Sequence, residues 1–196
     1  MRRYSLKEKV PAEFSWYNEP ETYYFDGGLI IKTKPETDFW QRTHYGFKRD
    51  NGHFLYTNIN YDFSFTAYLE FNYEGIYDQC GLMLRLDKDN WIKISTEYEN
   101  KKYSRLGSVV TNLGYSDWAT TDIASDIKSM WYRVSKKGQD FLIENSRNGD
   151  NWTQMRITHL HQEIKDLEVG IYTCSPQDSS FECKVSNIKI TESEWN

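Results

Sequence analysis

The sequence predicts an all-β protein folded as an antiparallel sandwich of two sheets. Short segments in which apolar and polar residues alternate follow one another along almost the whole chain, and this period of two is typical of strands with one buried face. Turns rich in Gly, Asn and Asp separate the segments. Strands and helices do not alternate along the chain, which argues against a parallel sheet and favours antiparallel pairing.

In the first half of the chain, the segment 62–71 gives the clearest strand signal. Its inward positions carry Phe63, Phe65, Ala67, Leu69 and Phe71, while its outward positions are mainly polar. Further strands are expected at 14–16, at 29–33 after a Gly-Gly pair, and at 54–56. The composition of 35–38 predicts a turn.

In the second half, a hairpin is expected over 81–98 and a strand over 104–111. Strands at 131–135 and 140–144 flank a turn at Lys137 and Gly138, and Asn148-Gly149 is a strong hairpin-turn dipeptide that leads into 152–156. Strands at 168–174 and 181–190 close the domain. Short helical turns at 121–128 and 160–166 are the expected exceptions to this all-β pattern.

Length and charge restrict the class of protein. A chain of 196 residues fits one domain, which we expect to span 1–196. Its apolar runs are shorter than a membrane-spanning helix requires, and the N-terminal residues lack the apolar region of a secretory signal. We therefore expect a cytoplasmic protein with no membrane association. The net charge of −5 argues against nucleic acid as a partner.

The chain has three cysteines, Cys80, Cys174 and Cys183. An odd number without a secretory signal favours free thiols in a reducing compartment. The alternative is a disulfide between Cys174 and Cys183, which could face each other across a hairpin.

The hairpin over 81–98 has two chemically different faces, and the polar one is the first candidate site. Leu82, Leu84 and Ile92 are among the residues of the inward face, which can pack in a core. The other face groups hydrogen-bonding residues with a ring on which a sugar can stack. Its candidate ligand-binding residues are Arg85, Trp91, Lys93 and Glu97. The alternative is a cross-strand ladder of ion pairs with a packed Trp.

Two further segments are candidate parts of the same site. Trp40, Arg42 and His44 share one face if their segment is extended, and a strand there could join the concave sheet. The alternative is a structural role for the His. A polar loop after 111 could form the rim of a cleft, or could simply cap its own turn. Its candidate binding residues are Asn112, Tyr115, Asp117 and Trp118.

Several segments together resemble a known family. They are 38–46, 80–98, 105–118, 131–134 and 169–176. These segments are similar to the concanavalin A-like jelly-roll family that includes the fungal regulation of enolase protein 1, and the resemblance covers about 12–191. It implies a lectin- or glucanase-like jelly roll. It also suggests a link to sugar metabolism and enolase regulation.

Catalytic and metal-binding signals are weak. Glucanases of this fold carry an alternating Glu-x-Asp-x-Glu triplet, and the sequence contains none. Glu97 and Glu99 share a face, which makes Glu97 a weak catalytic candidate. His159, His161 and Glu163 alternate in a polar segment, and a solvated loop is the better interpretation than a metal site.

We therefore expect a non-catalytic binding module for a carbohydrate or a related polar or anionic metabolite, such as a sugar phosphate, on the concave sheet. Two alternatives remain open at the level of sequence. The same face could dock a partner protein in sugar metabolism, since aromatic residues and Arg also dominate protein interfaces. The chain could also be a carbohydrate-active enzyme. We expect neither a cofactor nor a metal ion.

Overall fold

The computed structural model describes residues 1–195, and strands make up its regular secondary structure. The strands of the first half are β1 (Arg2–Ser5), β2 (Ser15–Tyr17), β3 (Thr22–Phe25), β4 (Leu29–Lys32), β5 (Phe39–Gln41), β6 (Lys48–Asp50), β7 (His53–Ile59), β8 (Phe63–Asn72) and β9 (Gln79–Asp87). Those of the second half are β10 (Asn90–Tyr98), β11 (Tyr103–Asn112), β12 (Tyr115–Ala124), β13 (Ser129–Lys137), β14 (Asp140–Ser146), β15 (Thr153–His159), β16 (Leu167–Cys174) and β17 (Glu182–Glu192).

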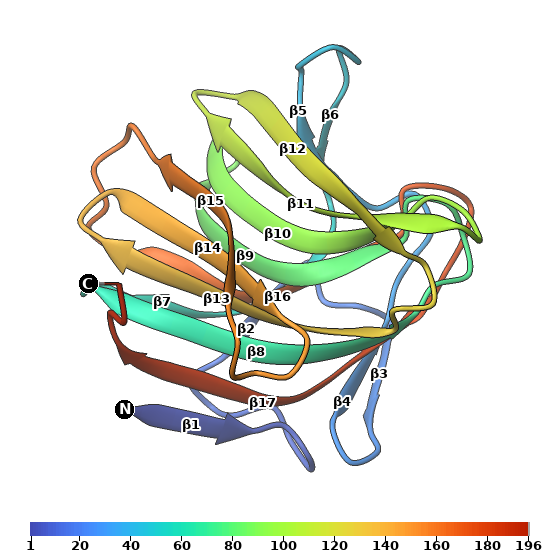
Figure 1. Cartoon of the computed structure of the whole chain (residues 1–196), viewed down its shortest axis with the longest axis horizontal. Helices are drawn as coiled ribbons and strands as arrows, with labels where there is room; N and C mark the ends of the chain where they lie inside the picture. The colour runs from blue at the N-terminus through green and yellow to red at the C-terminus, as the bar shows by residue number, and fades with distance from the viewer. Residues whose placement is uncertain (196) are drawn as a thin grey trace.

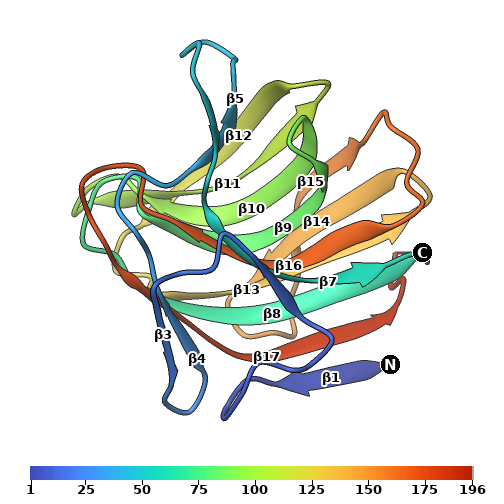
Figure 2. The ribbon, with the colours of Figure 1, turned by 180° about the vertical axis from the view of Figure 1, so that it is seen from behind.

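Two large antiparallel sheets form the layers of the sandwich (Figure 1). The first has the order β15-β14-β13-β8-β17-β4-β3, with β1 paired to β17. The second has the order β12-β11-β10-β9-β16-β7-β2. The strands β5 and β6 pair only with each other and project as a hairpin from the layer of the second sheet (Figures 1 and 2).

The main core fills the space between the two sheets, as the alternation in the sequence predicts. In the hairpin of β9 and β10, Ile92 lies opposite Leu84 and Ile94 opposite Leu82. These side chains belong to the same buried cluster as Phe63, Phe65, Ala67, Leu69 and Phe71 of β8. Burial of these large apolar groups stabilises the sandwich, at roughly 25 cal/mol for each Å² removed from water.

A second apolar cluster lies on the outer face of the second sheet. Phe39 and Trp40 of the β5–β6 hairpin cover this face, and Trp91 at its centre is fully buried. Its other buried members are Phe54, Met83, Val109, Tyr172 and Cys174. The middle of this sheet is therefore buried on both faces, whereas an antiparallel sheet commonly has one face on the core and the other in solvent.

Two expectations, on helical turns and on the cysteines, can be compared with the structure. The helical turns expected at 121–128 and 160–166 are wrong: within residues 1–195 no helix is assigned, and β12 continues to Ala124. The three cysteines are buried and unpaired. Cys183 lies in the core between the sheets and Cys174 in the outer cluster, so a disulfide between them is excluded here. Burial raises the pKa of the Cys174 thiol, which keeps it protonated.

Nothing within the described residues forms a helix of the length and apolarity needed to cross a bilayer.

Candidate functional site

A cavity of about 500 Å³ lies on the outer face of the second sheet, beside the β5–β6 hairpin. This volume is within the range of sites for small molecules, about 300–1,000 Å³. Strands β9 to β12 form the floor and one wall, and the hairpin with the loop before it forms another. The lining combines aromatic rings with charged groups. Its charged members are Glu36, Asp38, Arg49, Lys93, Glu97, Glu99 and Arg105.

The register of the sheet brings the charged residues of the floor together. Lys93 and Glu97 lie on the same face of β10, since strand side chains alternate with a period of two. Glu97 pairs with Arg105 of β11 and with Gln79 of β9, directly across on either side. Glu97 is therefore the centre of a row of polar side chains that crosses three strands.

Lys93 forms a buried ion pair at the back of the cavity. Its Nζ lies 3.0 Å from Oδ1 of Asp38, and its side chain is 4% exposed. Burial alone would lower the pKa of Lys93, but the nearby Asp38 carboxylate outweighs burial, so that the pKa is raised. The pair joins the loop before β5 to the floor of the cavity.

Glu97 is a carboxyl group held in its protonated form. Burial raises its pKa to about 8, and the carboxylates of Asp38 and Glu99 act in the same direction against the opposing effect of Lys93. Its Oε2 accepts a hydrogen bond of 2.7 Å from Nε2 of Gln79. At neutral pH this carboxyl group thus presents a hydroxyl donor to the cavity, where it remains partly exposed.

The amide of Gln79 is oriented by a buried tyrosine. The hydroxyl of Tyr172 donates to Oε1 of Gln79 at 3.0 Å, which directs the amide nitrogen toward Glu97. The hydrogen-bonded chain runs from the buried outer cluster to the cavity and fixes the position of the Glu97 carboxyl group.

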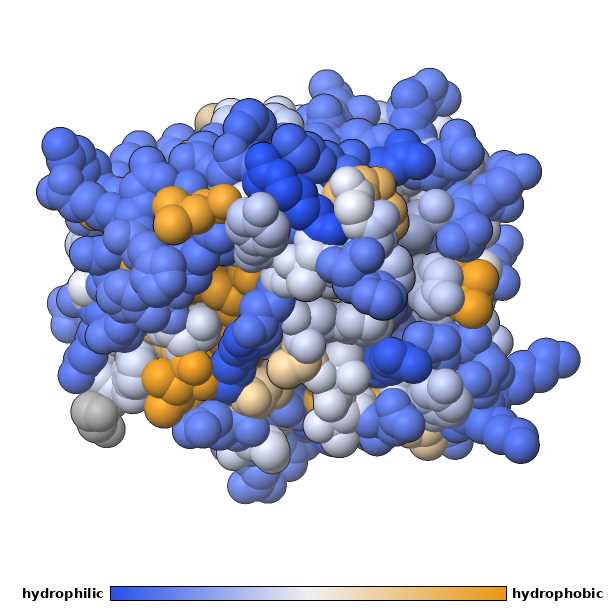
Figure 3. Space-filling model, turned by 90° about the horizontal axis from the view of Figure 1, so that it is seen from above, coloured by the Kyte–Doolittle hydropathy of each residue, from blue (hydrophilic) through white to orange (hydrophobic). Residues whose placement is uncertain are grey.

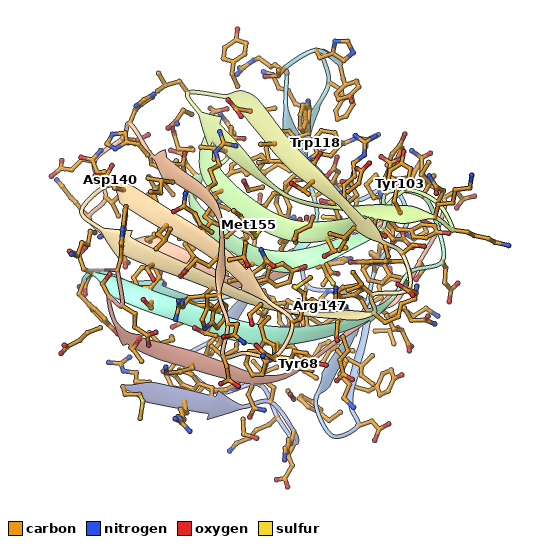
Figure 4. The ribbon with its side chains drawn as sticks, viewed as in Figure 1. Tyr68, Tyr103, Trp118, Asp140, Arg147 and Met155 are labelled. Atoms are coloured by element: carbon orange, nitrogen blue, oxygen red, sulfur yellow. The ribbon has the colours of Figure 1, made fainter. Side chains whose placement is uncertain are left out.

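Aromatic rings form the opposite side of the cavity. Trp40 and Trp118 meet edge to face with their centroids 6.4 Å apart, and Figure 4 shows Trp118 on β12 near the base of the β5–β6 hairpin. The guanidinium of Arg105 lies 5.3 Å from the centre of the Trp118 ring. Nε of Arg105 is also 2.8 Å from Oε1 of Glu99. The partly exposed Trp118 ring and the polar side chains of Glu97, Glu99 and Arg105 therefore border the same cavity.

Four of the sequence-predicted residues line this cavity: Trp40, Lys93, Glu97 and Trp118. The 40–44 segment and the hairpin of β9 and β10 were expected to contribute to one cleft. Of the residues predicted in the 40–44 segment, Trp40 lines the cavity together with Lys93 and Glu97 of β10. The indole of Trp40 is largely buried, and its Nε1 donates to the carbonyl of Thr43 at 3.1 Å.

The expectation of a shared face for Trp40, Arg42 and His44 is wrong, because β5 ends at Gln41. Arg42 and His44 have positive φ angles of 56° and 62° and lie in the turn of the hairpin. Nη1 of Arg42 donates to the carbonyl of Gly114 at 2.6 Å. His44 is exposed at the tip and does not line the cavity.

Trp91 and Arg85 also have structural roles where binding roles were expected. The Trp91 ring is fully buried beneath the β5–β6 hairpin, and its Nε1 donates to the carbonyl of Lys88, so that the ring offers no face to a ligand. Arg85 lies 3.1 Å from Asp50 and 3.4 Å from Glu168, with its guanidinium over the ring of Tyr17. Arg85 thus fixes the end of β6 to the sheet.

Of the four residues expected to form a rim, Trp118 lines the cavity, whereas Asn112, Tyr115 and Asp117 do not. Asn112 bonds to the backbone of His159 and His161, which supports the alternative of a structural role for its loop. Asp117 pairs with Arg156 at 2.8 Å, and Tyr115 lies exposed beside Arg42. The expected loop is itself regular, because Tyr115 begins β12 and Trp118 lies within it.

Several polar residues of the site were not among the predicted ones, and three of them, Asp38, Gln79 and Arg105, contact Lys93, Glu97 or the Trp118 ring. The signal for Gln79 and Arg105 was present, since the β9–β10 register places Gln79 opposite Glu97 and the β10–β11 register places Arg105 opposite it. The pairing of Asp38 with Lys93 links residues far apart in the sequence, and no local pattern reveals it. The described residues contain no group of three or more His, Cys, Asp or Glu side chains arranged to hold a metal ion.

Comparison with known proteins identifies a family, a yeast relative and similar solved structures. The family described as "Protein of unknown function (DUF1349)" matches residues 16–193. The Saccharomyces cerevisiae protein named Regulation of enolase protein 1 is 32% identical over 186 residues, which cover 94% of this chain and 89% of the yeast protein. A crystal structure of a protein from S. cerevisiae, described as functionally unknown, has a TM-score of 0.86 at 30% identity and covers 92% of this chain and 97% of its own.

More distant structures share the fold alone. The GH43 protein BlXynB from Bacillus licheniformis has a TM-score of 0.76 at 12% identity, and the match covers 96% of this chain but 38% of that protein. These comparisons and the two antiparallel sheets confirm the predicted jelly-roll sandwich and the family resemblance.

Proposed function

This chain belongs to the DUF1349 family, and we propose that it is a non-catalytic module that binds a neutral carbohydrate in the cavity beside the β5–β6 hairpin. The yeast relative is similar to it over almost the full length of the chain. The observation that carries the proposal is the composition of the cavity: hydrogen-bonding groups on its floor face aromatic rings across about 500 Å³.

The chemistry of a sugar matches both sides of this space. The hydroxyl groups of a sugar ring both donate and accept hydrogen bonds. At the border of the cavity the Arg105 guanidinium offers donors, and the protonated carboxyl group of Glu97 offers a donor and an acceptor. The C–H face of a sugar ring stacks on aromatic side chains, and Trp118 presents a partly exposed ring. A few placed polar groups against an aromatic wall are typical of small-molecule sites.

The charges of the cavity favour a neutral ligand over a sugar phosphate. Four acidic residues (Glu36, Asp38, Glu97 and Glu99) and three basic residues (Arg49, Lys93 and Arg105) line it. With Glu97 protonated, three charges of each sign remain, and two of the basic groups already pair with carboxylates. Arg42, His44 and Arg85, which suggested an anionic ligand, do not line the cavity.

Titration calorimetry of the purified chain against neutral sugars and sugar phosphates tests the proposal. We expect saturable binding of at least one neutral sugar, weakened about tenfold or more in Trp118→Ala because the stacking face is lost. Trp152→Ala is the matched control, since Trp152 lies against Arg133 of β13 in the other sheet. Equal affinities in wild type and Trp118→Ala, or no binding across the panel, would contradict the proposal. Assaying the same mixtures for new reducing ends separates binding from cleavage.

A protein-interaction role is the second candidate, and the name of the yeast relative, Regulation of enolase protein 1, favours it. Calorimetry of the chain with purified enolase tests it directly. Seen from the side to which the hairpin projects, hydrophobic residues form small separate patches in a mainly hydrophilic surface (Figure 3). That surface lacks the broad apolar area of a permanent interface, so binding to a partner there would be weak.

A further inference from the structure

The tip of the β5–β6 hairpin carries two exposed aromatic rings at the mouth of the cavity. Tyr45 is 56% exposed and Phe47 is 44% exposed, and both line the cavity. Their rings are stacked, with centroids 5.7 Å apart and planes 22° apart. Two large rings exposed side by side form an apolar patch, and such patches mark sites of interaction or ligand binding.

These two rings continue the aromatic wall of the cavity outward. The centroid of the Trp40 ring lies 6.4 Å from that of Trp118 and 5.4 Å from that of Tyr45. Phe47 in turn stacks on Tyr45. The four rings therefore form one row that runs from the interior of the cavity to the tip of the hairpin.

The turn that carries the outer rings is fixed by its own hydrogen bonds. Gly46 N donates to the carbonyl of Arg42 at 2.7 Å, and Arg42 N donates to the carbonyl of Phe47 at 2.9 Å. Nη1 of Arg42 also donates to the carbonyl of Gly114, in the turn between β11 and β12. Arg42, which was expected to bind a ligand, thus holds the turn that carries the rings, and a fixed turn lowers the entropic cost of presenting them.

The row of rings points to a second, outer subsite: we propose that the ligand is a linear neutral oligosaccharide of two or more units, with a terminal unit in the cavity and the next unit on Tyr45 and Phe47. This inference rests on the proposed function. The polar groups that can recognise one unit, Glu97 and Arg105, lie on the floor, whereas the mouth presents rings. Recognition at the mouth therefore comes mainly from stacking, which tolerates variation in the second unit.

Calorimetry with the mono-, di- and trisaccharide of one neutral sugar tests this subsite. We expect wild type to bind the disaccharide about tenfold more tightly than the monosaccharide. The double variant Tyr45→Ala/Phe47→Ala should lose this gain and keep its affinity for the monosaccharide. Tyr61→Ala is the matched control, because Tyr61 is also exposed (40%) but does not line the cavity.

The outcomes separate the two proposals. If a monosaccharide binds and longer chains gain nothing in wild type, the subsite is refuted while the binding function stands. A gain that survives in the double variant refutes the assignment to Tyr45 and Phe47. If no sugar of any length binds, the proposed function fails and the subsite fails with it.

Discussion

The protonated carboxyl group of Glu97 makes the stability of the fold depend on pH in a defined direction. In the folded protein its pKa is about 8, against an ordinary value of 4.5. Between these two values the folded state holds a proton that the unfolded state has released. The free energy of unfolding therefore falls as the pH rises, and the loss is complete above the folded pKa.

The size of this loss follows from the two pKa values. Each unit of pKa difference corresponds to about 1.4 kcal/mol, so full ionisation costs at most about 5 kcal/mol. Because the carboxyl group borders the cavity, water there solvates the ionised form and reduces this free-energy cost. From about pH 6 to pH 8 the linkage relation gives a loss of about 2 kcal/mol.

Urea denaturation of wild type and Glu97→Gln over this pH range measures the effect. The Gln side chain has nearly the same shape, keeps an oxygen for Gln79 and does not titrate, so other ionisable groups cancel in the difference. We expect the variant to gain about 2 kcal/mol over wild type between pH 6 and pH 8. Glu163→Gln, at an exposed site, should give a constant difference. Parallel profiles for wild type and Glu97→Gln would refute the reasoning and show that Glu97 is already ionised.

Three further predictions concern the fold around the site. Arg85→Met leaves the two carboxylates that it pairs without their partner, and we expect the free energy of unfolding to fall by about 3 kcal/mol in urea denaturation. An unchanged value would contradict the anchoring role. Gly81→Ala places a methyl group against the backbone carbonyl of Ile94 inside the sheet, so we expect insoluble or unfolded protein. Gly46→Ala, in open space at φ +74°, should remain folded and lose about 1 kcal/mol.

The parts of the fold that follow from alternation were predictable from the sequence. The hairpin of β9 and β10 and the inward face of β8 form where the period of two places them. Local spacing also identifies which residues of β10 share a face, so Lys93 and Glu97 could be placed in a site. The same reasoning placed Trp91 on that face, where it does lie.

What alternation could not predict is that another segment covers this face. Trp91 is buried because Phe39, 52 positions earlier in the chain, packs against it at 6.2 Å between ring centroids. The partner of Lys93 is Asp38, at a similar separation in the sequence. The prediction that Arg42 and His44 share a face with Trp40 is wrong for a local reason: it requires an extended backbone, and both residues adopt positive φ. Composition gives little warning of such angles in residues other than Gly.

The β5–β6 hairpin pairs with neither main sheet, and this separation makes it replaceable. Every ladder of the sandwich is complete without the hairpin, and its base is fixed at Phe39 and at Asp50, which lie opposite each other. Residues 42–47 beyond that base can therefore change in length and sequence without disturbing the register of the sandwich. On the proposed binding function, we expect a library that varies only this tip to change ligand preference on a constant scaffold.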